Sequence, residues 1–275
     1  MVFRTTILIV FSVLLFSPDK PAEARELSCL ECHTPHYSRI NNCISCHRGD
    51  PRSTRLTVAH RQLIPGRYSY FTLPENQVTR RGQRHLQAGG CRRCHLIGCK
   101  GNRLAGNLDS VTRDATPAQL FEAVRQPALL MPDFHFTETQ IIEIVNALLA
   151  AGRESDSDPG EIPRLIYFAD DQGKKKGNVF NQNCGDCHRI LNPVLGSIGR
   201  GEVAPNLSGL LTEFYPRFSR DKERWSEKIL RKWLKNPRNI RPKVQMPPVR
   251  LKQEELNKLL IILKAEAVQR LKDKS

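Results

Sequence analysis

Four pentapeptides of the form Cys-x-x-Cys-His are the residues of this chain best suited to chemistry. Two thiols three positions apart lie on one side of a helical turn, and the next residue turns an imidazole toward the same side. This spacing predicts covalent attachment of c-type haem, in which the thiols form thioethers with the vinyl groups and the histidine binds the iron. The predicted attachment residues are Cys29, Cys32, Cys43, Cys46, Cys91, Cys94, Cys184 and Cys187, and the predicted proximal iron ligands are His33, His47, His95 and His188. One match could be a redox dithiol or half of a zinc site, but four matches favour four covalently bound haem c groups.

Two methionines are candidates for the opposite face of the iron. Met131 and Met246 each stand before a proline, and both lie downstream of an attachment motif. A thioether is a common second ligand of c-type haem. The alternative is that each methionine fills a gap in the core. We predict both as distal ligands.

Four histidines lie outside the motifs. The two N-terminal motifs have no nearby methionine, so bis-histidine ligation is expected there. His36 and His60 are the leading distal candidates, and His85 could replace either of them. His135 is expected at a pocket edge or on the surface. The sequence leaves open which histidine serves which motif.

The C-terminal two thirds of the chain contains the same order twice: motif, Asn-Leu, helix, Pro, Met-Pro, helix. In the first copy a helix is predicted from Thr116-Pro117 to about Arg125, and a capping box at 137–140 opens another helix that ends near Gly152. In the second copy helices are predicted from Trp225 through Trp233 and along the leucines at 256, 259, 260 and 263.

These two copies, together about residues 81–275, resemble class I cytochrome c domains. The resemblance implies that the motif helix packs against the C-terminal helix and that the methionine loop closes the haem crevice. It pairs His95 with Met131 and His188 with Met246. It also implies a proline carbonyl against the proximal imidazole. Pro205 matches that position, whereas Gly106 stands there in the first copy and leaves the tuning of that haem open.

The first two motifs begin only fourteen residues apart, at Cys29 and Cys43. This separation is too short for two haem domains. We therefore expect residues 25–80 to form a compact, loop-rich dihaem module, similar to parts of multihaem cytochromes. Residues 46–51 followed by Ala59-His60 also resemble cytochromes encoded in selenite and tellurite reduction clusters.

The N-terminus is typical of a cleavable signal peptide. Arg4 precedes an apolar run at 7–16, and Ala22-Glu23-Ala24 fits the cleavage rule. An uncleaved anchor is the alternative, but this run is about half of the roughly 20 residues that span a bilayer. The expected organisation is mainly α: signal peptide 1–24, dihaem module 25–80, class I cytochrome c domain 81–153, linker 154–163 and class I cytochrome c domain 164–275. The expected location is periplasmic.

The chain carries a formal net charge of +15. Haem propionates could balance part of it, and the remainder could steer an acidic redox partner or favour anionic lipid. The basic run from Arg217 to Arg241 is expected near the last haem, and nucleic acid is not an expected partner. Cys99 is the odd cysteine, predicted as a free thiol, with an intermolecular disulfide as the alternative.

Together these features resemble a tetrahaem c-type cytochrome, an electron carrier rather than an enzyme. The resemblance implies electron relay from a low-potential donor, through bis-histidine haems, to a higher-potential acceptor beyond the His/Met haems. One alternative is a multihaem reductase or peroxidase with an open iron, for example for selenite or tellurite. Another is a permanent cytochrome subunit of a quinol-oxidising membrane complex in a respiratory chain.

Overall fold

The computed structural model describes residues 28–37, 42–128, 130–155, 177–193, 195–218 and 223–264. The predicted signal peptide and nearly all of the predicted linker lie outside these residues. No helix within the described ranges is long and apolar enough to cross a membrane.

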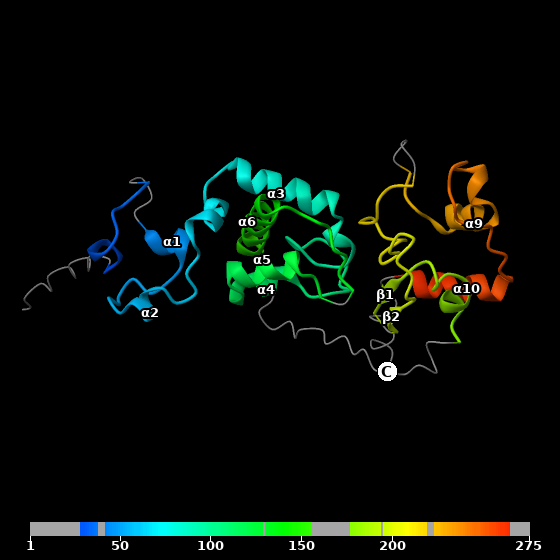
Figure 1. Ribbon diagram of the computed structural model, residues 1–275, viewed down its shortest axis with the longest axis horizontal. Helices are drawn as coiled ribbons and strands as arrows, with labels where there is room; N and C mark the ends of the chain where they lie inside the picture. Colours follow the sequence, from blue (N-terminus) through cyan, green and yellow to red (C-terminus); the bar gives the residue numbers. More distant parts are fainter. Residues whose placement is uncertain are drawn as a thin grey trace, which may run out of the picture.

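The described chain is mainly helical, as predicted, and its elements form three groups along the longest axis of the molecule (Figure 1). The N-terminal group contains η1 (Ser28–Glu31), α1 (Cys43–His47), α2 (Leu56–Ala59), η2 (Gly66–Tyr68) and η3 (Tyr70–Thr72). The middle group contains α3 (Gln77–Ala88), η4 (Cys91–Arg93), α4 (Leu108–Asp114), α5 (Pro117–Arg125) and α6 (Glu138–Glu154). The C-terminal group contains α8 (Val179–Asn183), β1 (Ile190–Asn192), β2 (Gly196–Ile198), α9 (Glu227–Lys235), η5 (Pro237–Asn239) and α10 (Gln253–Leu263).

In the middle group α3 packs across α6, and Figure 1 shows the two helices side by side. Their close approach depends on Gly82, because a Cβ atom there would lie 1.9 Å from the Glu143 carbonyl oxygen. The predicted domain boundary between residues 80 and 81 falls inside α3, which begins at Gln77 after the N-cap Asn76. The four residues Gln77 to Arg80 therefore belong to the same helix as the start of the predicted domain.

The predicted helix starts are confirmed in the middle group and shifted in the C-terminal group. Thr116 and Thr137 each form a full capping box, at α5 and α6. The predicted start at Trp225 is wrong by two residues, because the Ser226 side chain accepts from the N–H of Ile229 and caps α9 at Glu227. Trp225 therefore precedes the helix.

In the C-terminal group α8 and α10 pack around an antiparallel hairpin, β1–β2, with Ile190 opposite Ile198. The side-chain amide of Asn192 donates to the carbonyl of Ile262 at 2.8 Å and fixes the hairpin to α10. In both groups the helix that leads into the motif, α3 or α8, packs on the last helix, while the motif itself is a single turn.

The N-terminal group is joined to the middle group by buried contacts. Ile64 and Tyr68 pack against residues of α5 and α6. The fully buried amide of Asn146, in α6, donates to the Arg67 carbonyl at 3.0 Å and accepts from the Phe71 N–H at 3.1 Å. These contacts fix the segment that follows the first two motifs onto α6.

Candidate haem-binding sites

All four Cys-x-x-Cys-His motifs form a helical turn. In three of them the histidine N–H donates to the carbonyl of the first cysteine: His33 to Cys29 at 3.0 Å, His95 to Cys91 at 3.0 Å and His188 to Cys184 at 2.8 Å. The remaining motif is α1 itself, with its N-terminus capped by Asn42. A helical turn at each motif is the backbone geometry that the Cys-x-x-Cys-His spacing requires.

Backbone carbonyls orient three of the motif imidazoles. The acceptors are the carbonyls of Ile64 for His47, Gly106 for His95 and Pro205 for His188, each 2.8 Å from Nδ1. Because a carbonyl only accepts, Nδ1 carries the proton and Nε2 is left as the metal-binding nitrogen. The glycine at 106 therefore supplies the same carbonyl contact as the proline at 205, and only the proline ring is missing.

The loops that follow the third and fourth motifs repeat the same hydrogen bonds. The carbonyl of the second cysteine accepts from an alanine N–H, from Ala105 to Cys94 at 2.9 Å and from Ala204 to Cys187 at 3.1 Å. The carbonyl after the histidine accepts from the leucine of Asn-Leu, from Leu108 to Leu96 at 3.0 Å and from Leu207 to Arg189 at 2.9 Å. The repeated sequence order thus corresponds to a repeated loop geometry.

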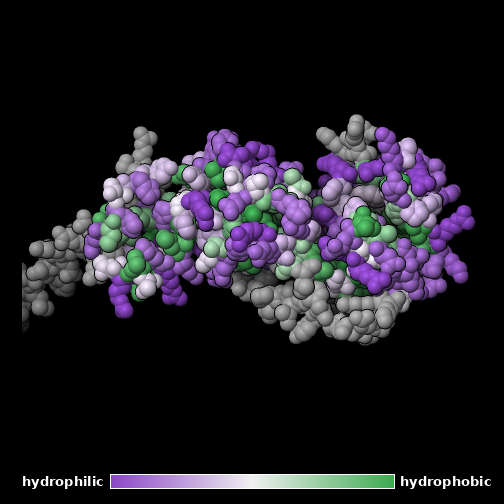
Figure 2. Space-filling view, in the orientation of Figure 1, coloured by the Kyte–Doolittle hydropathy of each residue, from purple (hydrophilic) through white to green (hydrophobic). Residues whose placement is uncertain are grey.

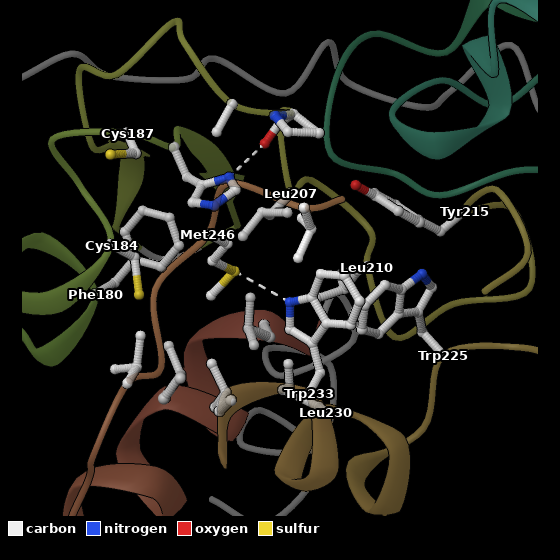
Figure 3. Close-up of a pocket in the computed structure, with 18 of the residues that line it drawn as sticks. Phe180, Cys184, Cys187, Leu207, Leu210, Tyr215, Trp225, Leu230, Trp233 and Met246 are labelled. Carbon is white, nitrogen blue, oxygen red and sulfur yellow. Dashed lines mark hydrogen bonds between the residues drawn. The ribbon is translucent and has the colours of Figure 1, made fainter. Parts of the chain in front are cut away.

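An apolar cavity of about 650 Å³ opens beside the fourth motif. Cys184, Cys187, His188 and Met246 all line it, and Figure 3 shows the Met246 sulfur and the Trp233 indole inside it. The indole Nε1 donates to the sulfur at 3.0 Å. The remaining lining includes Phe180, Leu207, Leu210, Leu230, Leu259 and Leu263. Two thiols, an imidazole and a thioether around an apolar space of this size fit a covalently bound haem.

Burial shifts the pKa values of three thiols in the third and fourth motifs. Burial raises the pKa of Cys91 and of Cys184 to about 11, and it also raises the pKa of Cys94. Burial also lowers the pKa of His95, against the opposing effect of the hydrogen bond that its Nδ1–H donates to the Gly106 carbonyl, and favours the neutral imidazole that binds a metal.

A second cavity, of about 520 Å³, brings together the first two motifs and both leading distal candidates. The ring centroids of His33 and His60 are 5.9 Å apart, and those of His36 and His47 are 5.6 Å apart. Metal–imidazole bonds of about 2.0 Å on opposite sides of one metal place two ring centroids about 6 Å apart. The pairing of these four histidines was left open by the sequence, and the structure brings their rings together as two pairs.

Three other candidates are placed elsewhere. His85 lies 2.9 Å from the buried carboxylate of Glu143, which also pairs with Arg81. His135 is 85% exposed and lies 3.2 Å from Asp133, as expected for a surface residue. Met131 is half-buried, on the segment between α5 and α6. Its ligand role stays a prediction.

Sequence reasoning missed several functional groups around these sites. The carbonyls of Ile64 and Gly106 carry no side-chain signature, so residue types could not reveal them. The contact of Trp233 with Met246 depends on how α9 sits over the methionine loop, which residue types alone do not reveal. The available sequence signal for this contact was a tryptophan, Trp233, on the predicted helix that precedes Met246-Pro247.

A helical fold with a Cys-x-x-Cys-His turn, a carbonyl-supported imidazole and two crossed helices defines a cytochrome c domain in the middle group. Residues 77–146 match the family model described as cytochrome C oxidase, cbb3-type, subunit III. This match covers α3 to α6 except the end of α6, and identifies one cytochrome c domain there. Searches of curated proteins and of solved structures find no match to the chain.

Proposed function

We propose that the chain is a tetrahaem c-type cytochrome that carries electrons between redox proteins outside the cytoplasm. The cytochrome c domain at residues 77–146 implies electron transfer and covalent haem. The other three motifs extend this role to four haems, since each forms the same helical turn. A bound haem would supply the one-electron change between ferrous and ferric iron.

The observation that carries this proposal is the pairing of histidines in the N-terminal cavity. His60 lies beside His33, and His36 lies beside His47. The iron of each N-terminal haem would therefore have two imidazole ligands. Met246 lines the same cavity as His188 and would be the second ligand of the last haem. An iron with both axial positions filled by protein exchanges electrons and has no position open for substrate. This ligand set favours a carrier over an enzyme.

The same ligands give the relay a direction. Thioether ligation raises the reduction potential of haem relative to bis-histidine ligation. Electrons would enter at the N-terminal pair and leave through the His/Met haems at Met131 and Met246. The donor would be a low-potential partner such as a quinol-oxidising complex.

Charge around the last haem site supports an acidic partner. Arg217 and Arg241, the ends of the basic run, both line the cavity that contains Met246. Figure 2 shows mainly hydrophilic side chains over the C-terminal group on the visible face. A positive rim at the haem edge would orient an acidic redox protein and speed its association. The family matched by residues 77–146 is named for an oxidase subunit, which supports a respiratory complex as partner.

The test uses the mature holoprotein, produced from the full chain so that the signal peptide directs its export. A haem count by mass and an anaerobic redox titration with EPR should give four low-spin haems in two potential groups. His60→Ala and His36→Ala should each turn one haem high-spin, because each removes one of the facing imidazoles.

His135→Ala is the matched control, since this exposed imidazole faces only Asp133. A high-spin haem in the unmodified resting protein would contradict a pure carrier and favour a reductase or peroxidase. An N-terminal pair that titrates at or above the other two haems would contradict the proposed direction.

A further inference from the structure

The third attachment motif makes direct contact with the C-terminal group through Arg93. This residue lies between Cys91 and Cys94, and its guanidinium reaches into the loop that follows the fourth motif. Nη2 donates to the carbonyl of Asn206 at 2.5 Å, and Nε donates to the carbonyl of Ser208 at 3.2 Å. One side chain therefore links two motifs that are about ninety residues apart in the sequence.

Tyr215 completes the receiving site. The Arg93 guanidinium carbon lies 4.3 Å from the centroid of the Tyr215 ring, and the Tyr215 hydroxyl donates to the same Asn206 carbonyl at 3.0 Å. In Figure 3 Tyr215 lies at the side of the cavity nearest the teal ribbon of the middle group. Asn206 directly follows Pro205, whose carbonyl orients His188. Arg93 thus anchors the loop that holds the proximal imidazole of the next haem site.

The two backbones also come close together at this point. The buried amide of Asn102 donates to the Arg93 carbonyl and to the Thr212 hydroxyl, both at 2.9 Å. Gly209 has φ +69°, and a Cβ atom there would lie 2.9 Å from the Arg93 carbonyl oxygen. A side chain at 209 would push the two groups apart. The contact is therefore shaped by backbone as well as by charge.

Arg93 also lines the cavity that contains Met246. Its backbone belongs to the third haem site and its cationic end to the fourth. We propose that Arg93 is a positioning residue for electron transfer between these two haems, fixing their separation and placing a positive charge beside the fourth. This inference rests on the proposed function. The step moves one electron and no proton: the haem at Cys91–His95 is oxidised as the haem at Cys184–His188 is reduced.

Arg92 provides a matched control in the same motif. Its Nε and Nη2 both donate to the carbonyl of Ile97 at 3.1 Å, within the middle group. Arg92→Gln and Arg93→Gln remove the same charge from adjacent positions, but only the second breaks the contact with the C-terminal group. Arg93→Lys keeps the charge and loses the paired hydrogen bonds.

Two readouts test the docking and the transfer separately. In hydrogen exchange of the holoprotein, amides of residues 204–215 should exchange about tenfold faster in Arg93→Gln and Arg93→Lys than in Arg92→Gln, because a lost charged hydrogen bond favours opening by about that factor. After flash photoreduction, transfer to the fourth haem should slow about tenfold or more in both Arg93 variants, since small displacements strongly reduce such rates. Only Arg93→Gln should also lower the potential of the fourth haem, because a nearby positive charge favours the reduced iron.

Equal exchange and equal transfer rates in Arg93→Gln and Arg92→Gln would overturn the inference. Gly209→Ala should reproduce the faster exchange with both arginines intact, and an unchanged exchange rate there would contradict the backbone part of the contact. A wild-type protein with fewer than four haems would contradict the proposed function instead. In that case hydrogen exchange still decides whether Arg93 docks the two groups.

Discussion

The middle and C-terminal groups orient their motif histidine identically but build different cores behind it. His95 donates to Gly106 and His188 donates to Pro205, both at 2.8 Å, within loops that repeat the same backbone hydrogen bonds. Behind these loops the middle group has a twelve-residue helix, α3, whereas the C-terminal group has the five-residue α8 and a small hairpin. The loop that holds the imidazole is therefore the constant part, and the scaffold around it varies.

The two groups also differ around the predicted distal ligand. Met246 lies in a defined cavity, with an indole N–H bound to its sulfur. Met131 lies on a segment between two helices. Substitution of each methionine is therefore the most sensitive way to compare the haem sites of the two groups.

The largest effect is expected from removing the thioethers. Met246→Ala should abolish the methionine–iron charge-transfer band of one haem and lower its potential by on the order of 0.1 V, within the roughly 0.8 V over which axial ligands set haem potentials. Met131→Ala should do the same to a different haem. Spectra recorded during a redox titration distinguish the two. If Met131→Ala leaves every band and potential unchanged, the middle group uses another ligand.

Next in size is the close crossing of α3 and α6 at Gly82 in the middle group. Gly82→Ala should lower the free energy of unfolding by about 1–3 kcal/mol, because the new methyl would overlap the Glu143 carbonyl. Helix propensity alone would predict a gain of about 1 kcal/mol. Urea unfolding of the holoprotein measures the balance. Gly66→Ala, where a Cβ atom meets nothing within 4 Å, is the control, and a stabilised Gly82→Ala protein would show that the helices can separate at no cost.

A smaller effect should follow from loss of the indole donor in the C-terminal group. Trp233→Phe removes the N–H bound to the Met246 sulfur and leaves the aromatic contacts with Phe218 and Trp225 largely intact. Without this donor the sulfur is more electron-rich and stabilises ferric iron. The potential of the last haem should fall by about 40 mV, equivalent to a hydrogen bond of about 1 kcal/mol. Trp225→Phe should leave the potential in place, and equal shifts in both variants would point to general packing.

The smallest effect is expected where the two loops differ in residue type. Gly106→Ala and Pro205→Ala keep the carbonyl that accepts from the histidine, and Gly106 has open space around its Cβ position. Both variants should change unfolding free energy by less than about 1 kcal/mol and leave the haem spectra unchanged. Spectral change at Gly106→Ala but not at Pro205→Ala would show that the two loops hold their imidazoles differently.

Local signals in the sequence predicted the mainly helical fold and several helix ends. The capping boxes at Thr116 and Thr137 are confirmed because a cap is decided by residues within one turn. The start of α9 was placed too early because Trp225 matched the apolar pattern, whereas the hydroxyl of Ser226 supplies the cap. At the start of α9 the capping hydrogen bond, and not the apolar periodicity, determines the first helical residue.

Long-range partners could not be predicted in the same way. His85 was a ligand candidate by type, but its contact with Glu143 depends on the crossing of α3 and α6. The reach of Arg93 to Asn206 depends on how two separately coded segments meet. Carbonyl acceptors belong to every residue, so no spacing of side chains could identify Gly106 or Ile64.

Asn146 has a consequence for how the protein unfolds. Its single buried amide satisfies the Arg67 carbonyl, the Phe71 N–H and the Ile142 carbonyl, so it joins the stretch after the first two motifs to the middle of α6. If that stretch detached, the Asn146 amide would lose its hydrogen bonds to the Arg67 carbonyl and from the Phe71 N–H at once, at a cost of about 1–3 kcal/mol for each polar group left unpaired. The N-terminal and middle groups should therefore melt as one cooperative unit.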